Sequence, residues 1–487
     1  MNRFLLIAVL VLMVLPTAAL ALPDSNQIEF NNCMLALPGT NMTAPARCGF
    51  YDVTEDPANP DGRQITLHVA IAPATGKTTE PDPVFFFAGG PGQAASETWV
   101  IIRSTLSKLR KSRDIVMIDQ RGTGQSNKLA CESDIEEDLN QEIDLELIRT
   151  ETEKCLADLD GDPRLYTTSI AMGDYNQVRS AMGYDKINIM GVSYGTRAAQ
   201  VYLRLFPESV RTVTLDSVVP MQLALGQEHA PMLDRSVRTV FEDCAADVTC
   251  NSLFPGQARE LNTLFTQLRQ EPRQITIINP VTGEPQEMRL TADTLAVAIR
   301  FLSYSSETQA LIPLLVHEAL STGDLSRLAS QAILVMAGLN EMLARGMELS
   351  VMCSEDYPFI DQTQDQSDSL IGNLFLEVIG LQCEVWPRGN VAEGFHEAVV
   401  SDLPVLLMSG ERDPVTPPHY AALTAETFLN SLNLVARGRS HSVMKNVCLR
   451  DITTEFINKG SIEGLDTACV EKILPAPFFT SLLGPDP

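Results

Sequence analysis

The chain has 487 residues, of which 45% are hydrophobic and 20% charged, so it can bury a core as two or three domains or as one large fold with an insertion. Its 62 acidic and 36 basic residues give a formal net charge of −26. Such a surface repels the phosphates of nucleic acids and anionic membranes, so we expect neither as a partner.

The N-terminal segment is typical of a secretory signal peptide. A short basic start precedes an apolar run from Phe4 to Leu15, and Ala19-Leu20-Ala21 offers the small residues that signal peptidase reads. The run is shorter than the about 20 residues that a membrane helix needs. We expect cleavage after Ala21, which makes 1–21 a signal peptide. The mature chain is then exported to the periplasm or the extracellular medium, without a membrane span.

Short apolar runs rich in β-branched and aromatic residues alternate with helical stretches from about residue 64. Strands that are apolar throughout and separated by helices are typical of a parallel sheet covered on both faces. The sequence therefore predicts an α/β fold. Its expected strands are 64–72, 84–87, 115–118, 187–190, 210–215, 405–408 and 432–436.

The strand signal fades between residues 221 and 395, where Leu-, Ala- and Gln-rich helical periodicity replaces it. This change predicts a mostly helical cap, inserted into a sheet-bearing core that comprises residues 22–220 and 396–487.

A candidate nucleophile lies in Gly191-Val192-Ser193-Tyr194-Gly195, which matches the pattern G-x-S-x-G. An expected strand precedes the motif and a helical stretch follows it. A sharp strand-to-helix turn lifts a serine hydroxyl out of the sheet, and the flanking glycines keep Cβ atoms out of the crowded turn. We therefore expect Ser193 to be the nucleophile.

The acid and the base should follow the serine in the order Asp or Glu, then His. Asp413 stands at the carboxyl end of the strand 405–408, and of the two later histidines we expect His419 at the surface and His441 as the base. Asp216, at the end of the strand 210–215, is the rival acid. The remaining histidines precede the late strand, and these are His68, His229, His317 and His396.

An acyl-transfer reaction also needs two hydrogen-bond donors for the oxyanion of its tetrahedral intermediate. The backbone N–H of Tyr194, directly after the nucleophile, is the first candidate. The Gly-rich loop Ala88-Gly89-Gly90-Pro91-Gly92 supplies the second, for which we favour the N–H of Gly90.

Three ordered motifs resemble those of a known family. The segments 89–92, 119–126 and 191–195 look like the proline iminopeptidase and tripeptidyl aminopeptidase group of α/β-hydrolases. The segment 410–418, with His441, Cys448 and Cys469, is similar to the C-terminal region of the secreted tripeptidyl aminopeptidases. The resemblance implies an α/β-hydrolase fold with a helical cap and a serine peptidase that removes residues from free peptide N-termini. The sequence shows no metal site, phosphate loop or nucleotide fingerprint, so we expect no metal and no other cofactor. We interpret Asp119 and Arg121 as an ion-paired loop that supports the oxyanion turn.

Two alternatives stay open beside the exopeptidase. The same triad would serve an esterase or amidase acting on small molecules. A binding protein on an inactive hydrolase fold is the other, and the presence of the whole triad argues against it.

The ten cysteines are even in number and contain no C-x-x-C pair, which favours disulfides in an exported chain. Each falls in the same segment as its sequence neighbour, so we expect the pairs Cys33–Cys48, Cys131–Cys155, Cys244–Cys250, Cys353–Cys383 and Cys448–Cys469. Glu355 and Asp356 follow one of these cysteines in the cap. Adjacent acids on a loop held by a disulfide are candidates to bind a substrate's α-ammonium group.

Overall fold

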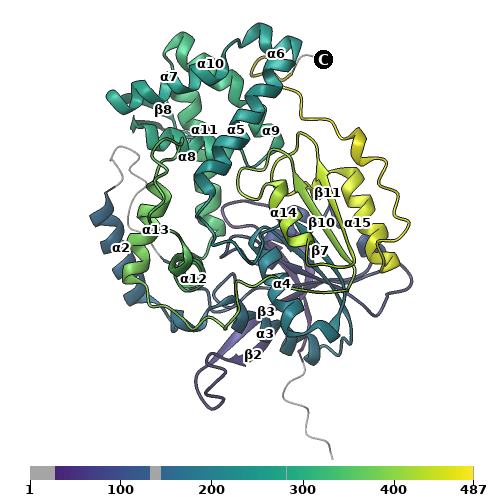
Figure 1. The fold of residues 1–487 in the computed structure, drawn as a ribbon. Coiled ribbons are helices and arrows are strands. Elements are labelled where there is room, and N and C mark those ends of the chain that lie inside the picture. Colours follow the sequence, from purple (N-terminus) through teal and green to yellow (C-terminus); the bar gives the residue numbers. More distant parts are fainter. Residues whose placement is uncertain (1–27, 132–143, 281, 486–487) are drawn as a thin grey trace, which may run out of the picture.

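The computed structural model describes residues 28–131, 144–280 and 282–485 (Figure 1). The expected signal peptide, residues 1–21, lies outside these ranges. In the described part of the chain, no helix combines the length and the apolar character that crossing a membrane requires.

A nine-stranded sheet with the order β1-β2-β3-β5-β4-β6-β7-β10-β11 forms the core. The pairs from β1 to β5 along this order are antiparallel, and those from β5 to β11 are parallel. All seven expected strands are present, whereas β1 and β2 are additions. The strands are β1 Asn31–Ala36, β2 Thr43–Thr54, β3 Gln64–Ala72, β4 Val84–Phe87, β5 Ile115–Ile118, β6 Ile187–Val192, β7 Val210–Asp216, β10 Val405–Gly410 and β11 Ser431–Ala436.

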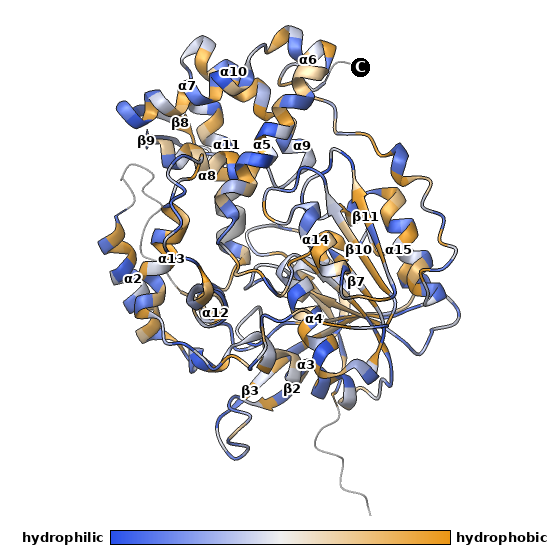
Figure 2. Ribbon diagram, in the orientation of Figure 1, coloured by the Kyte–Doolittle hydropathy of each residue, from blue (hydrophilic) through white to orange (hydrophobic). Residues whose placement is uncertain are grey.

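Helices cover both faces of this sheet, as the fully apolar strands require. Along β4, Phe85 and Phe87 face one layer while Val84 and Phe86 face the other. Helices α3 and α4 contribute to the first layer, and α1 and α15 to the second. Figure 2 shows the apolar strands enclosed in this way. The helices outside the insertion are α1 Ala95–Ile102, α2 Leu145–Asp158, α3 Thr168–Ala181, α4 Tyr194–Leu205, α14 Pro418–Ala425 and α15 Val447–Lys459.

From α5 to α11, the chain between β7 and β10 builds a separate layer with a hydrophobic core of its own, whereas α12 and α13 pack into the core on one face of the large sheet. This insertion is mostly helical, as expected, but it also contains an antiparallel hairpin of β8 and β9, which the helical periodicity does not predict. Its elements are α5 His229–Ala246, α6 Val248–Leu253, α7 Gln257–Gln270, β8 Arg273–Ile278, β9 Pro285–Leu290, α8 Ala292–Leu302, α9 Ser306–Gln309, α10 Ile312–Thr322, α11 Ser326–Met342, α12 Arg345–Val351 and α13 Leu374–Val385.

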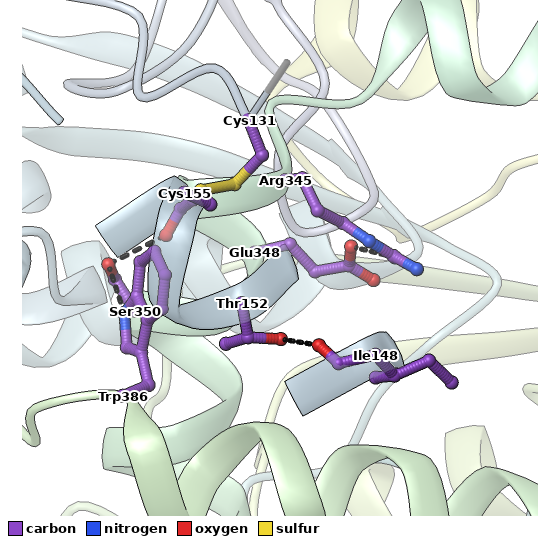
Figure 3. Close-up of a disulfide and its surroundings, with 9 residues drawn as sticks. Cys131, Ile148, Thr152, Cys155, Arg345, Glu348, Ser350 and Trp386 are labelled. Carbon is purple, nitrogen blue, oxygen red and sulfur yellow. Dashed lines mark hydrogen bonds and ion pairs between the residues drawn. A yellow bond between two sulfur atoms is a disulfide. The ribbon is translucent and has the colours of Figure 1, made fainter. Parts of the chain in front are cut away.

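All five expected disulfides are present, and every cysteine is paired with its sequence neighbour. The Cys131–Cys155 bond anchors α2 (Figure 3), and α2 packs against α13 of the insertion (Figure 1). Close to this bond, the indole N–H of Trp386 donates to the hydroxyl of Ser350 at 3.1 Å. Each disulfide closes within the core or within the insertion, so packing of α2 against α13 and buried hydrogen bonds such as those of Thr168 to Glu355 join the insertion to the rest of the chain.

Candidate active site

Ser193 occupies the turn between β6 and α4. Its backbone has φ 57° and ψ −127°, a conformation that few non-glycine residues adopt. The crowding around it explains the two glycines of the motif. A Cβ atom on Gly191 would lie 2.3 Å from the carbonyl oxygen of Gly195, and one on Gly195 would lie 2.2 Å from that of Phe87. The strained turn holds a partly exposed serine at the carboxyl end of a central strand.

The Gly-rich loop after β4 lies beside this serine. A Cβ atom on Gly89 would lie 3.2 Å from the Cβ of Ser193. Gly90 and Gly92 have φ values of 105° and 107°, which side-chain-bearing residues rarely adopt. Gly90 is exposed. Tyr194 is the first residue of α4, where backbone N–H groups have no partner within the helix. Both residues expected to donate to an oxyanion therefore lie next to Ser193.

Asp413 and His441 are hydrogen-bonded to each other, with Oδ2 of the acid 2.8 Å from Nδ1 of the imidazole. The carboxylate is fully buried, and the histidine side chain is 11% exposed. Burial alone raises the pKa of Asp413, but the charge of His441 and the backbone N–H groups of Val415 and Thr416 bring it below its ordinary value. Burial lowers the pKa of His441, and the Asp413 carboxylate raises it by more, so the net shift is upward.

Asp216, the rival acid, binds the backbone of the histidine loop. Its carboxylate accepts the N–H groups of Val443 at 3.0 Å and Met444 at 3.1 Å. Its main-chain carbonyl accepts the N–H of Ser193 at 3.0 Å. This single residue connects the turn that bears the serine with the loop that bears His441. Burial raises the pKa of Asp216, and its two backbone donors offset only part of that rise.

Two neighbours of His441 were not anticipated from the sequence. The hydroxyl of Thr416 donates to Asp413 Oδ2 at 2.7 Å and lies 3.2 Å from Nδ1 of His441. From the insertion, Tyr304 accepts the backbone N–H of His441 at 3.2 Å, and its ring meets the imidazole edge to face at 5.2 Å. Asp-x-x-Thr is a local turn pattern that the sequence displays, whereas Tyr304 lies far away in sequence and carries no motif.

The other histidines are held elsewhere. His419 is exposed, as expected. The remaining four have partners away from the Asp413 carboxylate, and these are Asp119 for His68, Arg300 for His229, Glu260 for His317 and two backbone carbonyls for His396.

Glu355 and Asp356 are fully buried, and both lie close to the N-terminal part of α4, which bears Tyr194 and Arg197. Glu355 accepts the N–H and the hydroxyl of Thr168 at 2.5 and 2.7 Å, and the hydroxyl of Tyr194 is 2.6 Å from that same Thr168 hydroxyl. Asp356 forms an ion pair with Arg197 at 2.5 Å. Burial raises the pKa of Glu355 to about 7. Among the described residues, Arg197 pairs with Asp356 alone, and Oδ2 of Asp356 has no hydrogen-bond partner. Their role as an ammonium site stays a prediction.

The loop of Asp119 and Arg121 is ion-paired, as expected, although the two side chains do not pair with each other. Asp119 accepts from Ser96 and lies 2.9 Å from Nδ1 of His68. Arg121 instead forms a bidentate pair with Asp174 on α3. The two side chains thus have different partners, Asp174 for Arg121 and His68 with Ser96 for Asp119. Asp119 still supports the oxyanion loop, because Ser96 belongs to the helix that follows it.

The chain is similar to known hydrolases and peptidases. A family model described as the alpha/beta hydrolase fold matches residues 82–445. The tripeptidyl aminopeptidase of Streptomyces coelicolor is 24% identical over 481 residues, covering 90% of this chain and 85% of that protein. Serine protease Hip1 of Mycobacterium tuberculosis is 24% identical over 500 residues, covering 93% of each. Carboxylesterase B of M. tuberculosis is 28% identical over 238 residues, covering 45% of each.

Proposed function

The chain belongs to the α/β-hydrolase family, and from that premise we propose that it is a serine exopeptidase acting on free peptide N-termini. One observation carries the proposal. The hydrogen-bonded Asp413–His441 pair is connected through Asp216 to the strained turn of Ser193. A hydroxyl, an imidazole and a buried carboxylate in this order are the parts of an acyl-transfer triad.

The reaction follows from the chemistry of these groups. His441 takes the proton of Ser193 as the serine oxygen attacks the substrate carbonyl, and then gives it to the leaving amine. Asp413 fixes the tautomer of the imidazole and stabilises its protonated form. The N–H groups of Gly90 and Tyr194 bind the oxyanion, and each such donor is worth about 3–4 kcal/mol of transition-state stabilisation. Water then hydrolyses the acyl-enzyme by the same steps.

The preference for free N-termini rests on two supports. One is the similarity to a protein named tripeptidyl aminopeptidase along most of both chains. The other is the buried acidic pair. Arg197 pairs with Asp356, whereas Glu355 has no cationic partner in the described structure, so a substrate ammonium would balance the charge of the ionised Glu355 carboxylate. We retain these two residues as the proposed ammonium site.

An esterase or amidase acting on small molecules is the second candidate, and the similarity to carboxylesterase B favours it. Chromogenic amides with free or acetylated N-termini, assayed beside matched esters, separate the two. The exopeptidase should hydrolyse free-amine amides at least tenfold faster than their acetylated counterparts. A preference for acetylated substrates or for esters would contradict the exopeptidase proposal and support the esterase.

We also propose that the protein is exported. The five disulfides, which persist in oxidising compartments, support this location together with the signal-like sequence at residues 1–21. Fractionation of cells that express the full chain should place the mature protein in the periplasm or the medium, with Leu22 as its first residue.

A further inference from the structure

Arg300 on α8 is a buried arginine without an acidic partner in the described structure. It is 8% exposed, and its Nη1 atom has no hydrogen-bond partner among the described residues. The other buried arginines of the described structure each pair with a carboxylate, and these pairs are Arg113–Asp82, Arg121–Asp174, Arg197–Asp356 and Arg412–Asp243. Burying a cation without such a partner costs folding free energy. We therefore expect Arg300 to have a function that offsets this cost.

The groups around Arg300 hold it in place without neutralising its charge. Its Nη2 lies 3.2 Å from Nδ1 of His229, and its guanidinium lies over the rings of Tyr304 and Phe375 at 5.8 and 6.0 Å. Burial, together with the charge of Arg300, lowers the pKa of His229 well below its ordinary value, so this imidazole is neutral. Aromatic faces offset only part of the cost of burying a cation, and less of it than a paired carboxylate does.

This unpaired cation lies one aromatic ring away from the proposed base. Tyr304, which packs against Arg300, also packs against the imidazole of His441 and accepts its backbone N–H. The charge of Arg300 acts on His441 through space. His441 hands its proton to the leaving group, so the departing part of a substrate would lie on the side of the scissile bond where His441, Tyr304 and Arg300 are packed.

We propose that Arg300 binds a carboxylate of the substrate on the leaving-group side of the scissile bond. The inference rests on the proposed function and narrows its substrate class to peptides that carry a negative charge near the cleaved bond. An arginine with free N–H donors suits a carboxylate, because its planar fork can donate two parallel hydrogen bonds. The carboxylate is either the free C-terminus of a short leaving peptide or an acidic side chain in that peptide.

The test compares two substrate pairs, both with free N-termini. One pair differs only in a C-terminal carboxylate or carboxamide, and the other, amidated at its C-terminus, differs in Glu or Gln after the cleaved bond. The wild-type protein should prefer the charged member of at least one pair, and the responding pair identifies the source. Arg300→Met should reduce that preference about 10- to 100-fold, the range expected for a charge-assisted hydrogen bond. Arg300→Lys should retain part of it.

Arg269→Met is the matched control. Arg269 is an exposed arginine of the same insertion and lies over the ring of Phe265 at 5.7 Å. Its replacement should leave both preferences unchanged. If Arg300→Met does not fold, inhibition of the wild-type protein by product peptides replaces it, and the free acid should inhibit at least tenfold more strongly than its amide. Equal wild-type rates within both pairs, or equal losses on both members in Arg300→Met, would overturn the proposal. Failure of the proposed function is seen separately, as a preference for acetylated amides or esters.

Discussion

The carboxylate of Asp216 accepts the backbone N–H of Val443 at 3.0 Å, two residues beyond His441. Asp216 ends β7, a strand that lies between β6 with its serine turn and β10, which leads to Asp413. It therefore fixes the main chain of the histidine loop, while Asp413 fixes the ring. Two acids at the ends of neighbouring strands thus have different tasks, one on the backbone and one on the imidazole.

Because the two acids have different tasks, their alanine variants should differ in kcat and in the free energy of unfolding. Asp413→Ala should lower kcat about 10⁴-fold, because the imidazole loses the group that sets its tautomer. Asp216→Ala should lower kcat much less, but it leaves buried N–H groups unsatisfied and should reduce the free energy of unfolding by about 1–3 kcal/mol. Steady-state kinetics and urea denaturation of both variants provide the comparison. A larger kcat loss in Asp216→Ala would show that the acid is misassigned.

The proposed nucleophile and base should act as a unit. Ser193→Ala and His441→Ala should each remove nearly all hydrolysis, and the double variant should be no slower than either single variant. Each protein should keep the circular dichroism spectrum and the unfolding midpoint of the wild type within a few degrees. Losses that multiply in the double variant would mean that the two residues work independently.

The fold was largely predictable from the sequence, because parallel strands buried on both faces are apolar throughout. The runs 84–87 and 115–118 match β4 and β5 in full. β1 and β2 were not predicted, because strands at an antiparallel edge alternate buried and exposed residues and include charged ones such as Arg47. The triad candidates could be found by their order along the chain. Tyr304 and Arg300 could not, since a cap residue reaches the site only through tertiary packing.

The acid side of the pH–activity profile should respond in opposite directions to two nearby charges. The reaction needs neutral His441. Burial lowers the pKa of this imidazole, but the Asp413 carboxylate raises it above its ordinary value, so kcat/KM should fall as the pH drops through that raised pKa. Asp413 and Asp216 raise the pKa of His441, and Arg300 lowers it. Asp216→Asn should therefore move the acid limb to lower pH, and Arg300→Met should move it to higher pH. Profiles of kcat/KM between pH 5 and 9 test this, and shifts in the same direction would contradict the assignment.

The disulfides should differ in their contribution to stability according to the loops that they close. Cys353–Cys383 spans 30 residues and Cys244–Cys250 spans 6. The chain-entropy model gives about 4 kcal/mol for the first and about 2 kcal/mol for the second. Double Cys→Ala variants of each pair, unfolded in urea, should follow this order. The pairing itself is checked by mass spectrometry of a non-reduced digest, in which a link between different segments would contradict it.

Charge-removing variants of Glu355 and Asp356 test whether these acids bind the substrate's ammonium group. Asp356→Asn and Glu355→Gln remove one negative charge each and preserve shape, so they should raise KM for free-amine peptides about 10- to 100-fold, the range expected for a charge-assisted hydrogen bond. Acetylated esters, which carry no ammonium, should be affected far less. Glu384→Gln is the control, because Glu384 is an exposed acid on α13 that pairs with Arg149 at 2.5 Å. A purely structural role of the pair would slow both substrate classes alike, and normal cleavage of free-amine peptides by both variants and their double would place the ammonium site elsewhere.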